Sequence, residues 1–270
     1  RIFNELNLLL SSKKSSPVML LMHNSGLLKC IFPTLYKNKT LLPSLEVLNH
    51  IEIMLSDLKR IGVRPLIKIK KIISDSTELI KLGSILYPLA KKPPTKIIKQ
   101  QHNRNRKDKV GELLNELRAS NTEINFITAM ISCWHSASYS KLDFAGSHPN
   151  QFQLYGFVRL NEEGLIPGLF LYLANRPKLP SAKQWKKDKP LLAVQNVLSF
   201  YFRTYLPAKA EKPLLNGNDI QKKFKIKPNP FFKIILLKVE EARVLGNIKT
   251  RAEAISFAKN IITSKQKEND

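Results

Sequence analysis

A basic run over residues 91–109 contains the residue types that neutralise phosphates. It reads KKPPTKIIKQQHNRNRKDK and holds eight Lys or Arg and one Asp. Four of its cations fall within six residues, directly before an expected helix: Arg104, Arg106, Lys107 and Lys109. Such side chains bind nucleic acid through backbone phosphates, which gives affinity but does not read base sequence. The run is therefore either an RNA contact or an ordinary solvated loop, and both interpretations stay open.

Metal or nucleophilic chemistry would need His, Cys and carboxylates at the spacing of ligands or of a catalytic triad. Cys30 and Cys133 lack zinc-ligand spacing. Trp134 and His135 beside Cys133 could indicate zinc or a nucleophile, but a helix end that packs Trp134 into the core is favoured. His50 is more simply a polar residue on a helix than a metal ligand. We therefore predict neither a metal site nor a catalytic residue in this chain.

Helical periodicity is the main structural pattern along the chain. Apolar residues recur at helical spacing over 46–61, 106–118 and 122–134, whereas alternating strand patterns are scarce. The sequence therefore predicts an all-α fold.

The C-terminal part has the clearest helix starts and stops. Pro230 suits the first position of a helix, and Gly246 suits a left-handed stop. Thr250, followed three residues later by Glu253, forms the pattern of a capping box. These signals predict helices near 218–226, 230–245 and 250–263.

Composition restricts the class of partner. The 270 residues include 45 Lys and Arg against 21 Asp and Glu, a net charge of +24. Such a surface attracts polyanions, most often nucleic acid, although compositional drift is an alternative source of the excess. No apolar run reaches the roughly 18 residues of a membrane span, so no membrane partner is expected. Two cysteines fit a reducing, cytoplasmic location. Because the chain begins with Arg1, we expect a piece of a longer protein.

The tail resembles the bacterial tRNA nucleotidyltransferase/poly(A) polymerase family. That family has a Gly-Asp-Leu/Ile helix start, a Gly-Pro step, a long helix and then Gly-x-Ile-x-Thr-Arg-Glu-Glu-Ala. Asn229 replaces the usual Gly of the Gly-Pro step. The matching residues are Gly217, Asp219, Ile220, Pro230, Gly246, Ile248, Thr250, Arg251, Glu253 and Ala254.

The rest of the chain resembles the same family, more weakly over 92–150 and 177–207. The start is similar to the neck that follows the catalytic head, through RIFNEL and SGLLKCIFPTL. The middle is similar to an HD-type body, through LPSLEVLNHIE, LIKLGSILYPLAKKP and a helix pair ending in LANR. The resemblance implies neck helices at 1–40, a degenerate HD-like, elongated helical body at 41–175, a basic linker with a connecting helix at 176–207, and a helical tail at 208–270.

Departures from the family pattern bear on chemistry. An HD site holds its metal with His and Asp, but Tyr87-Pro88 replaces the His-Asp doublet, and Ser44 and Glu46 replace an earlier His and Asp. His50 alone remains. Nucleotidyl transfer needs an Asp-x-Asp pair and a Gly-rich turn, and the sequence has neither Asp-x-Asp nor Gly-Gly. In the resembling family these lie in the head, together with the Mg ions, so no cofactor is expected in this chain.

The resemblance implies an RNA-gripping role. The chain would hold tRNA or another RNA and position its 3′ end for a catalytic head, which is either a separate chain or a missing segment. A divergent HD phosphohydrolase and a non-catalytic interaction scaffold are the alternatives. Analogy with the family adds four tail lysines to the candidate RNA contacts: Lys222, Lys223, Lys225 and Lys227.

Overall fold

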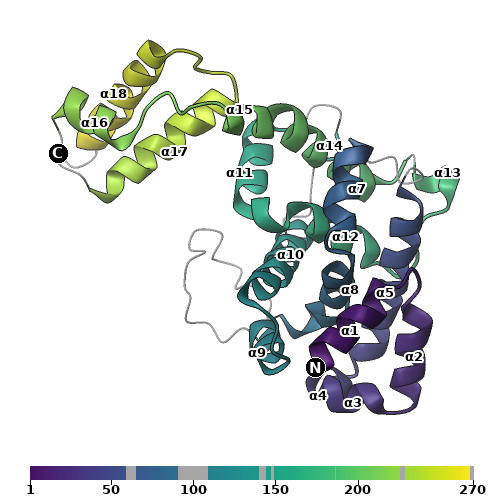
Figure 1. Cartoon of the computed structure of the whole chain (residues 1–270). Coiled ribbons are helices and arrows are strands. Elements are labelled where there is room, and N and C mark those ends of the chain that lie inside the picture. Colours follow the sequence, from purple (N-terminus) through teal and green to yellow (C-terminus); the bar gives the residue numbers. More distant parts are fainter. Residues whose placement is uncertain are drawn as a thin grey trace. The chain divides into compact units, whose positions relative to one another are not determined.

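The computed structural model describes residues 1–58, 65–90, 109–139, 144–146, 149–185, 187–225 and 229–267. Every element within these ranges is helical and none is a strand, so the all-α prediction is confirmed (Figure 1). The chain divides into two compact units, Arg1–His148 with Leu160–Leu198 and Pro149–Arg159 with Ser199–Asp270. The predicted domain boundaries and the HD-like character of the body stay predictions.

The first unit contains most of the helices. They are α1 (Ile2–Ser11), α2 (Ser16–Asn24), α3 (Leu27–Ile31), α4 (Pro33–Lys37), α5 (Leu41–Ser56), α7 (Leu66–Ser74), α8 (Thr77–Leu86), α9 (Lys109–Glu116), α10 (Asn121–Tyr139), α12 (Leu165–Ala174) and α13 (Ala182–Trp185). Short 3-10 turns lie at Tyr87–Leu89 and Glu162–Gly164. The boundary between the units falls within α11 (Gln151–Asn161) and α14 (Lys189–Phe200).

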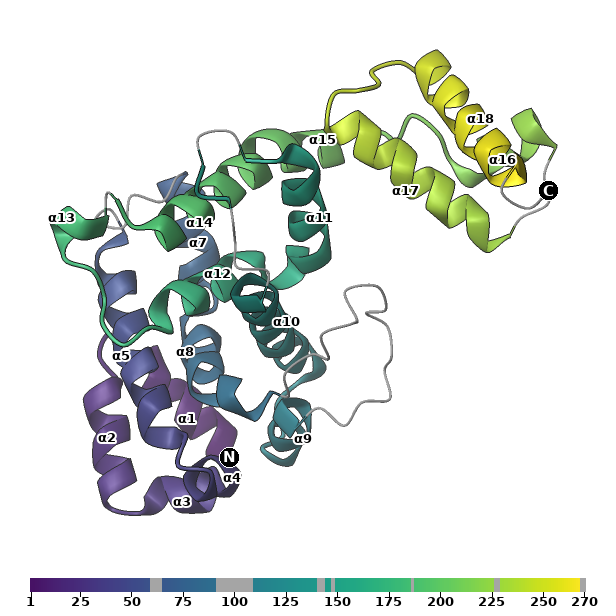
Figure 2. The ribbon, with the colours of Figure 1, turned by 180° about the vertical axis from the view of Figure 1, so that it is seen from behind.

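Helix α8 is the centre of the first unit. It packs against α1, α5 and α10, and both ribbon views show it between them (Figures 1 and 2). All residues from Ile80 to Leu86 are buried, so α8 has no solvent-facing side over these turns. A helix buried all round is expected to be apolar all round. Lys81 and Ser84 are the polar exceptions, and Lys81 forms a buried ion pair with Glu52.

Two glycines allow a close approach to α10: Gly164 of the 3-10 turn and Gly168 of α12. A Cβ on Gly164 would lie 2.2 Å from the backbone of Ala129, and a Cβ on Gly168 would lie 2.4 Å from Cβ of Cys133. Only glycine fits at either position without moving a helix. Cys133 is fully buried at this contact, and burial raises the pKa of its thiol well above the usual range. The structure therefore places Cys133 in the core and not at a reactive site.

The second unit forms a small helical core of its own. Its elements are a π-helical turn (Tyr201–Tyr205), α15 (Leu206–Ala210), α16 (Gly217–Phe224), α17 (Pro230–Val244) and α18 (Arg251–Lys267). Ile220, Ile235 and Ala258 are fully buried in this core. Arg243 joins α17 to the end of α15, because its guanidinium donates to the Ala208 carbonyl at 2.6 Å and pairs with Glu240 and Glu211.

The local signals read from the tail sequence are found in the structure. Gly246 has a φ of +78°, the left-handed conformation expected after α17. The Glu253 amide donates to Thr250 Oγ1, and the Thr250 amide donates to the Glu253 carboxylate, each at 3.2 Å. A second capping box, between Asn216 and Asp219, starts α16. The helices differ from the predicted ranges only at their ends, where α16 stops at Phe224 and α18 continues to Lys267.

Candidate nucleic-acid interface

The first 38 residues form four short helices fixed on one side to the body of the first unit. Helix α1 packs against α8, and α2 packs against α5. The contacts are apolar: Phe3, Leu6 and Leu10 of α1 and Met19 of α2 are buried. With one side of the segment anchored in this way, the side chains on its other side are left to solvent.

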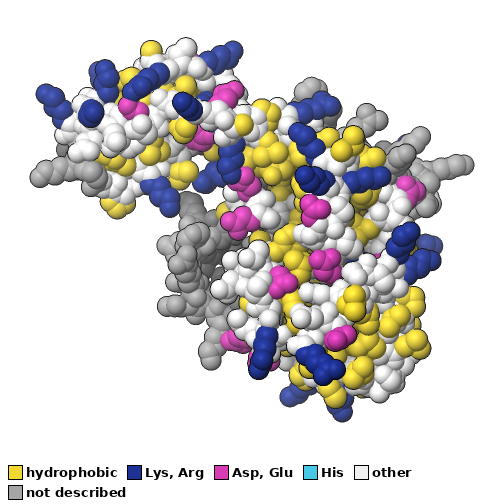
Figure 3. Space-filling view, viewed as in Figure 1, with side chains coloured by type: hydrophobic (Ala, Val, Ile, Leu, Met, Phe, Trp, Pro, Cys, Tyr) yellow, Lys and Arg dark blue, Asp and Glu magenta, His cyan; other side chains and the backbone are white. Residues whose placement is uncertain are grey.

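The exposed residues of this segment include both cations and apolar side chains. Residues 1–38 contain five Lys or Arg and one Glu, a net charge of +4. Among the exposed apolar side chains, Leu8 is 70% exposed and Leu21 is 67% exposed. Figure 3 shows hydrophobic side chains gathered over α2, with Lys and Arg side chains near the lower edge of the same region. The five cations are all exposed: Arg1, Lys13, Lys14, Lys29 and Lys37.

Tyr36 is an exposed aromatic residue flanked by a cation and a histidine. It is 40% exposed, and Lys29 Nζ lies 5.7 Å from the centroid of its ring. The His23 ring lies 5.9 Å from the same ring at an interplanar angle of 46°. His23 Nδ1 is buried and has no hydrogen-bond partner among the described residues. Aromatic side chains beside cations can stack an unpaired base and neutralise its phosphate.

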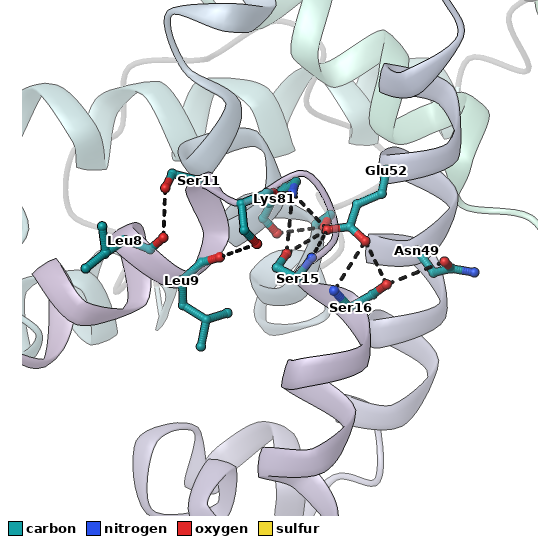
Figure 4. Close-up of polar contacts among 10 residues, drawn as sticks. Leu8, Leu9, Ser11, Ser15, Ser16, Asn49, Glu52 and Lys81 are labelled. Carbon is teal, nitrogen blue, oxygen red and sulfur yellow. Dashed lines mark hydrogen bonds and ion pairs between the residues drawn. The ribbon is translucent and has the colours of Figure 1, made fainter.

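A buried ion pair fixes the turn between α1 and α2 (Figure 4). Lys81 Nζ lies 2.8 Å from Glu52 Oε1, and the two side chains are only 2% and 4% exposed. The same carboxylate accepts from the amides of Ser15 (2.6 Å) and Ser16 (3.2 Å) and from both serine hydroxyls (2.7 Å each). Lys81 also donates to the Ser12 carbonyl at 2.6 Å. The network therefore ties residues 12–16 to both α5 and α8.

The electrostatics of this network favour a charged Glu52. Burial by itself would raise the pKa of the carboxyl, but hydrogen bonds from Lys81, Ser15 and Ser16 outweigh it and hold the pKa at about 2. The carboxylate also lies at the N-terminus of α2, where the partial positive charge of a helix favours an anion. Sequence reasoning missed this pair. The available signal was the charged Lys81 between the apolar residues Ile80 and Leu82, but it does not identify a partner.

The predicted cationic sites are only partly within the described residues. Lys109 begins α9 and is exposed. Lys222 and Lys223 lie in the last turn of α16, and Lys225 follows it with a φ of +52°, so the three exposed lysines share one end of that helix. Their contact with RNA stays a prediction. The remaining predicted cations lie outside the described residues: Arg104, Arg106, Lys107 and Lys227.

The positions that align with HD ligands make hydrogen bonds within the protein. His50 Nδ1 lies 2.9 Å from the Ala174 carbonyl, and the Tyr87 hydroxyl donates to Asn175 Oδ1 at 3.1 Å. Burial raises the pKa of Tyr87. Ser44 Oγ donates to the Leu41 carbonyl. Within the described ranges no three His, Cys, Asp or Glu side chains gather as a metal site.

The surroundings of Trp134 and His135 are aromatic. The rings of Tyr87 and Trp134 lie 4.7 Å apart in an edge-to-face arrangement, and the Trp134 and His135 rings lie 4.5 Å apart. Burial lowers the pKa of His135, because a charged ring would be desolvated there. The neighbouring rings and the burial of Cys133 agree with packing of this helix into the core, whereas Trp134 itself is half-buried.

Comparison with known proteins gives one match, and it falls on the N-terminal helices. Residues 1–38 match the family described as "Probable RNA and SrmB- binding site of polymerase A". This segment is therefore poly(A) polymerase-like, in agreement with that part of the resemblance. No curated protein and no solved structure matches the chain. In the part of the chain that the structure describes, no helix has the length and apolar character to cross a membrane.

Proposed function

We propose that this chain binds RNA and that the exposed side of residues 1–38 is a contact surface for it. The observation that carries the proposal is the coincidence of two features on one segment. The segment matches a family described as an RNA-binding site, and all five of its Lys and Arg side chains are exposed. Phosphate neutralisation by these cations supplies the affinity, and Tyr36 with Lys29 supplies a place for an unpaired base.

The finer proposal concerns what the bound RNA is for. The chain grips tRNA and presents its 3′ end to a nucleotidyltransferase or poly(A) polymerase head that these residues do not contain. The resemblance of the tail supports this role, as does the basic end of α16 with Lys222, Lys223 and Lys225. Any Mg would act in the head. The degenerate HD-like body then links the two RNA contacts along the chain.

A salt titration of tRNA binding tests the proposal. Each phosphate contact lowers log K by roughly 0.9 per decade of salt on duplex RNA or DNA, so replacing Lys13 and Lys14 with Ala should flatten the slope by about 2. The matched control replaces Lys70 and Lys71 of α7, which are also exposed and carry the same charge. No tRNA binding at about 50 mM salt, or an equal loss in both double variants, would refute this surface as the contact.

The apolar part of the same segment favours a second, compatible role in protein contact. The family description names SrmB as well as RNA. Leu8 and Leu21 present exposed apolar area that phosphate binding does not need. Replacing both with Ser should leave the salt slope for RNA unchanged and abolish binding of SrmB in a pull-down with purified proteins. If that variant still captures SrmB as the wild type does, the proposed protein contact is refuted.

A further inference from the structure

A hollow in the first unit lies between α5 and the segment that leads into α13. It has a volume of about 400 Å³. One side is lined by Asn49, His50, Ile53 and the exposed acidic residue Asp57, and the other by Lys178, Gln184 and Trp185. Both ribbon views show the C-terminal turns of α5 beside α13 (Figures 1 and 2). The volume falls within the roughly 300–1,000 Å³ of small-molecule sites.

One wall of the hollow is held in place by an ion pair. Arg176 Nη1 lies 3.1 Å and 3.2 Å from the two carboxylate oxygens of Asp188, which also accepts the Leu191 amide at the start of α14. The guanidinium of Arg176 sits over the Trp185 ring, 5.4 Å from its centroid. Trp185 is only 4% exposed. Both ends of the 176–188 segment are therefore anchored.

The polar groups around the hollow have unused hydrogen-bonding capacity. The side-chain oxygen of Gln184, Oε1, accepts from the Ser181 amide, so the side-chain NH2 group of Gln184 remains as a donor. Asn49 Oδ1 takes only a 3.4 Å contact from Ser16, and its NH2 group is a second donor. His50 Nδ1 must donate to the Ala174 carbonyl, so its Nε2 is an acceptor in the neutral ring. Lys178 is exposed and has no ion pair among the described residues.

We infer that this hollow binds one unstacked nucleotide of single-stranded RNA. Ile53, with the half-buried Leu179 and Pro180, offers apolar contact to a planar ring. The amides of Asn49 and Gln184 can donate to the acceptors that every base presents at its edge, and Lys178 supplies the cation for the phosphate. Sequence-specific and end-specific RNA binding generally uses such splayed-out bases. The inference rests on the proposed function and adds a second kind of contact to it.

Equilibrium dialysis of the full chain with 5′-AMP tests the site directly. Saturable uptake of AMP is expected, and Asn49→Ala and Lys178→Ala should each weaken it about five-fold or more, as for loss of one well-placed hydrogen bond or phosphate contact. Both residues are exposed, so neither change should unfold the chain. Lys70→Ala removes the same charge from α7 as Lys178→Ala does and should leave AMP affinity unchanged. Ribose 5-phosphate should compete much less well than AMP.

Short oligoadenylate and duplex RNA, measured with the same variants, separate this site from the proposed RNA surface. The two pocket variants should weaken oligoadenylate binding and leave duplex binding unchanged. No uptake of AMP, uptake unchanged in both pocket variants, or equal competition by ribose 5-phosphate would overturn the nucleotide site. If the AMP results fail but duplex RNA still binds, the proposed function is retained and only the nucleotide site is refuted. If no RNA shows salt-dependent binding, the proposed function is refuted and the AMP site is not.

Discussion

Replacing Lys81 with Met removes the cation of the buried pair while keeping an unbranched side chain that is shorter by only one heavy atom. Glu52 would keep its serine donors but lose the ammonium group of Lys81 at 2.8 Å, in a place where its side chain is 4% exposed. Breaking a buried ion pair by removing one partner costs about 3–5 kcal/mol, because a charge is left uncompensated. We therefore expect Lys81→Met to lower the free energy of unfolding of the first unit by about 3 kcal/mol at neutral pH.

The lowered pKa of Glu52 makes the stability contributed by this network depend on pH. A pKa of about 2 in place of 4.5 corresponds to about 3 kcal/mol, at 1.36 kcal/mol for each tenfold change. Because the folded pKa is lowered, this stabilisation is present above about pH 4.5 and is lost as the pH falls toward 2. The difference between the wild type and Lys81→Met should therefore be largest at neutral pH and shrink below about pH 4.

The measurement is urea unfolding followed by tryptophan fluorescence. Both tryptophans, Trp134 and Trp185, belong to the first unit, so their emission reports its unfolding. The control is Lys70→Met, at an exposed position of α7, and it should change the free energy of unfolding by less than about 0.5 kcal/mol. A cost of less than about 1 kcal/mol for Lys81→Met at pH 7, or an equal cost at pH 7 and pH 3, would refute the stabilising role of the buried pair.

Four further outcomes are expected. Gly168→Ala should destabilise the first unit by about 1–3 kcal/mol in urea unfolding, since its Cβ would meet Cys133; a neutral change would refute the close contact. Thr250→Ala should cost about 1 kcal/mol in thermal unfolding of the second unit, with Thr250→Ser close to wild type. Tyr36→Ala should lose about 1–3 kcal/mol of binding free energy for single-stranded RNA in filter binding, while Tyr36→Phe retains it. Replacing Lys222 and Lys223 with Ala should flatten the salt slope for tRNA by about 2, and an unchanged slope would exclude the end of α16 as a phosphate contact.

Local sequence determined the helices and several of their ends. The stop at Gly246 and the capping box of Thr250 and Glu253 depend on residues within one turn of one another, and both are present. Helical periodicity likewise predicted the all-α class, because the spacing of apolar residues reports directly on which face of a helix is buried. The cations of residues 1–38 are part of the sequence, but only the structure shows that all five are exposed.

Tertiary structure alone decided which distant residues meet. Ser15, Glu52 and Lys81 form one network although the hydrogen bonds that join them span 37 and 66 positions of sequence. Lys is rarely buried in proteins, so the sequence alone would place Lys81 at the surface. Lys81 is buried beside a carboxylate because α8 packs among α1, α5 and α10. The hollow between His50 and Trp185 depends in the same way on how α5 meets the 176–188 segment. Periodicity shows which side of each helix is buried, but not which other helix covers it, because that choice depends on how all the helices pack together.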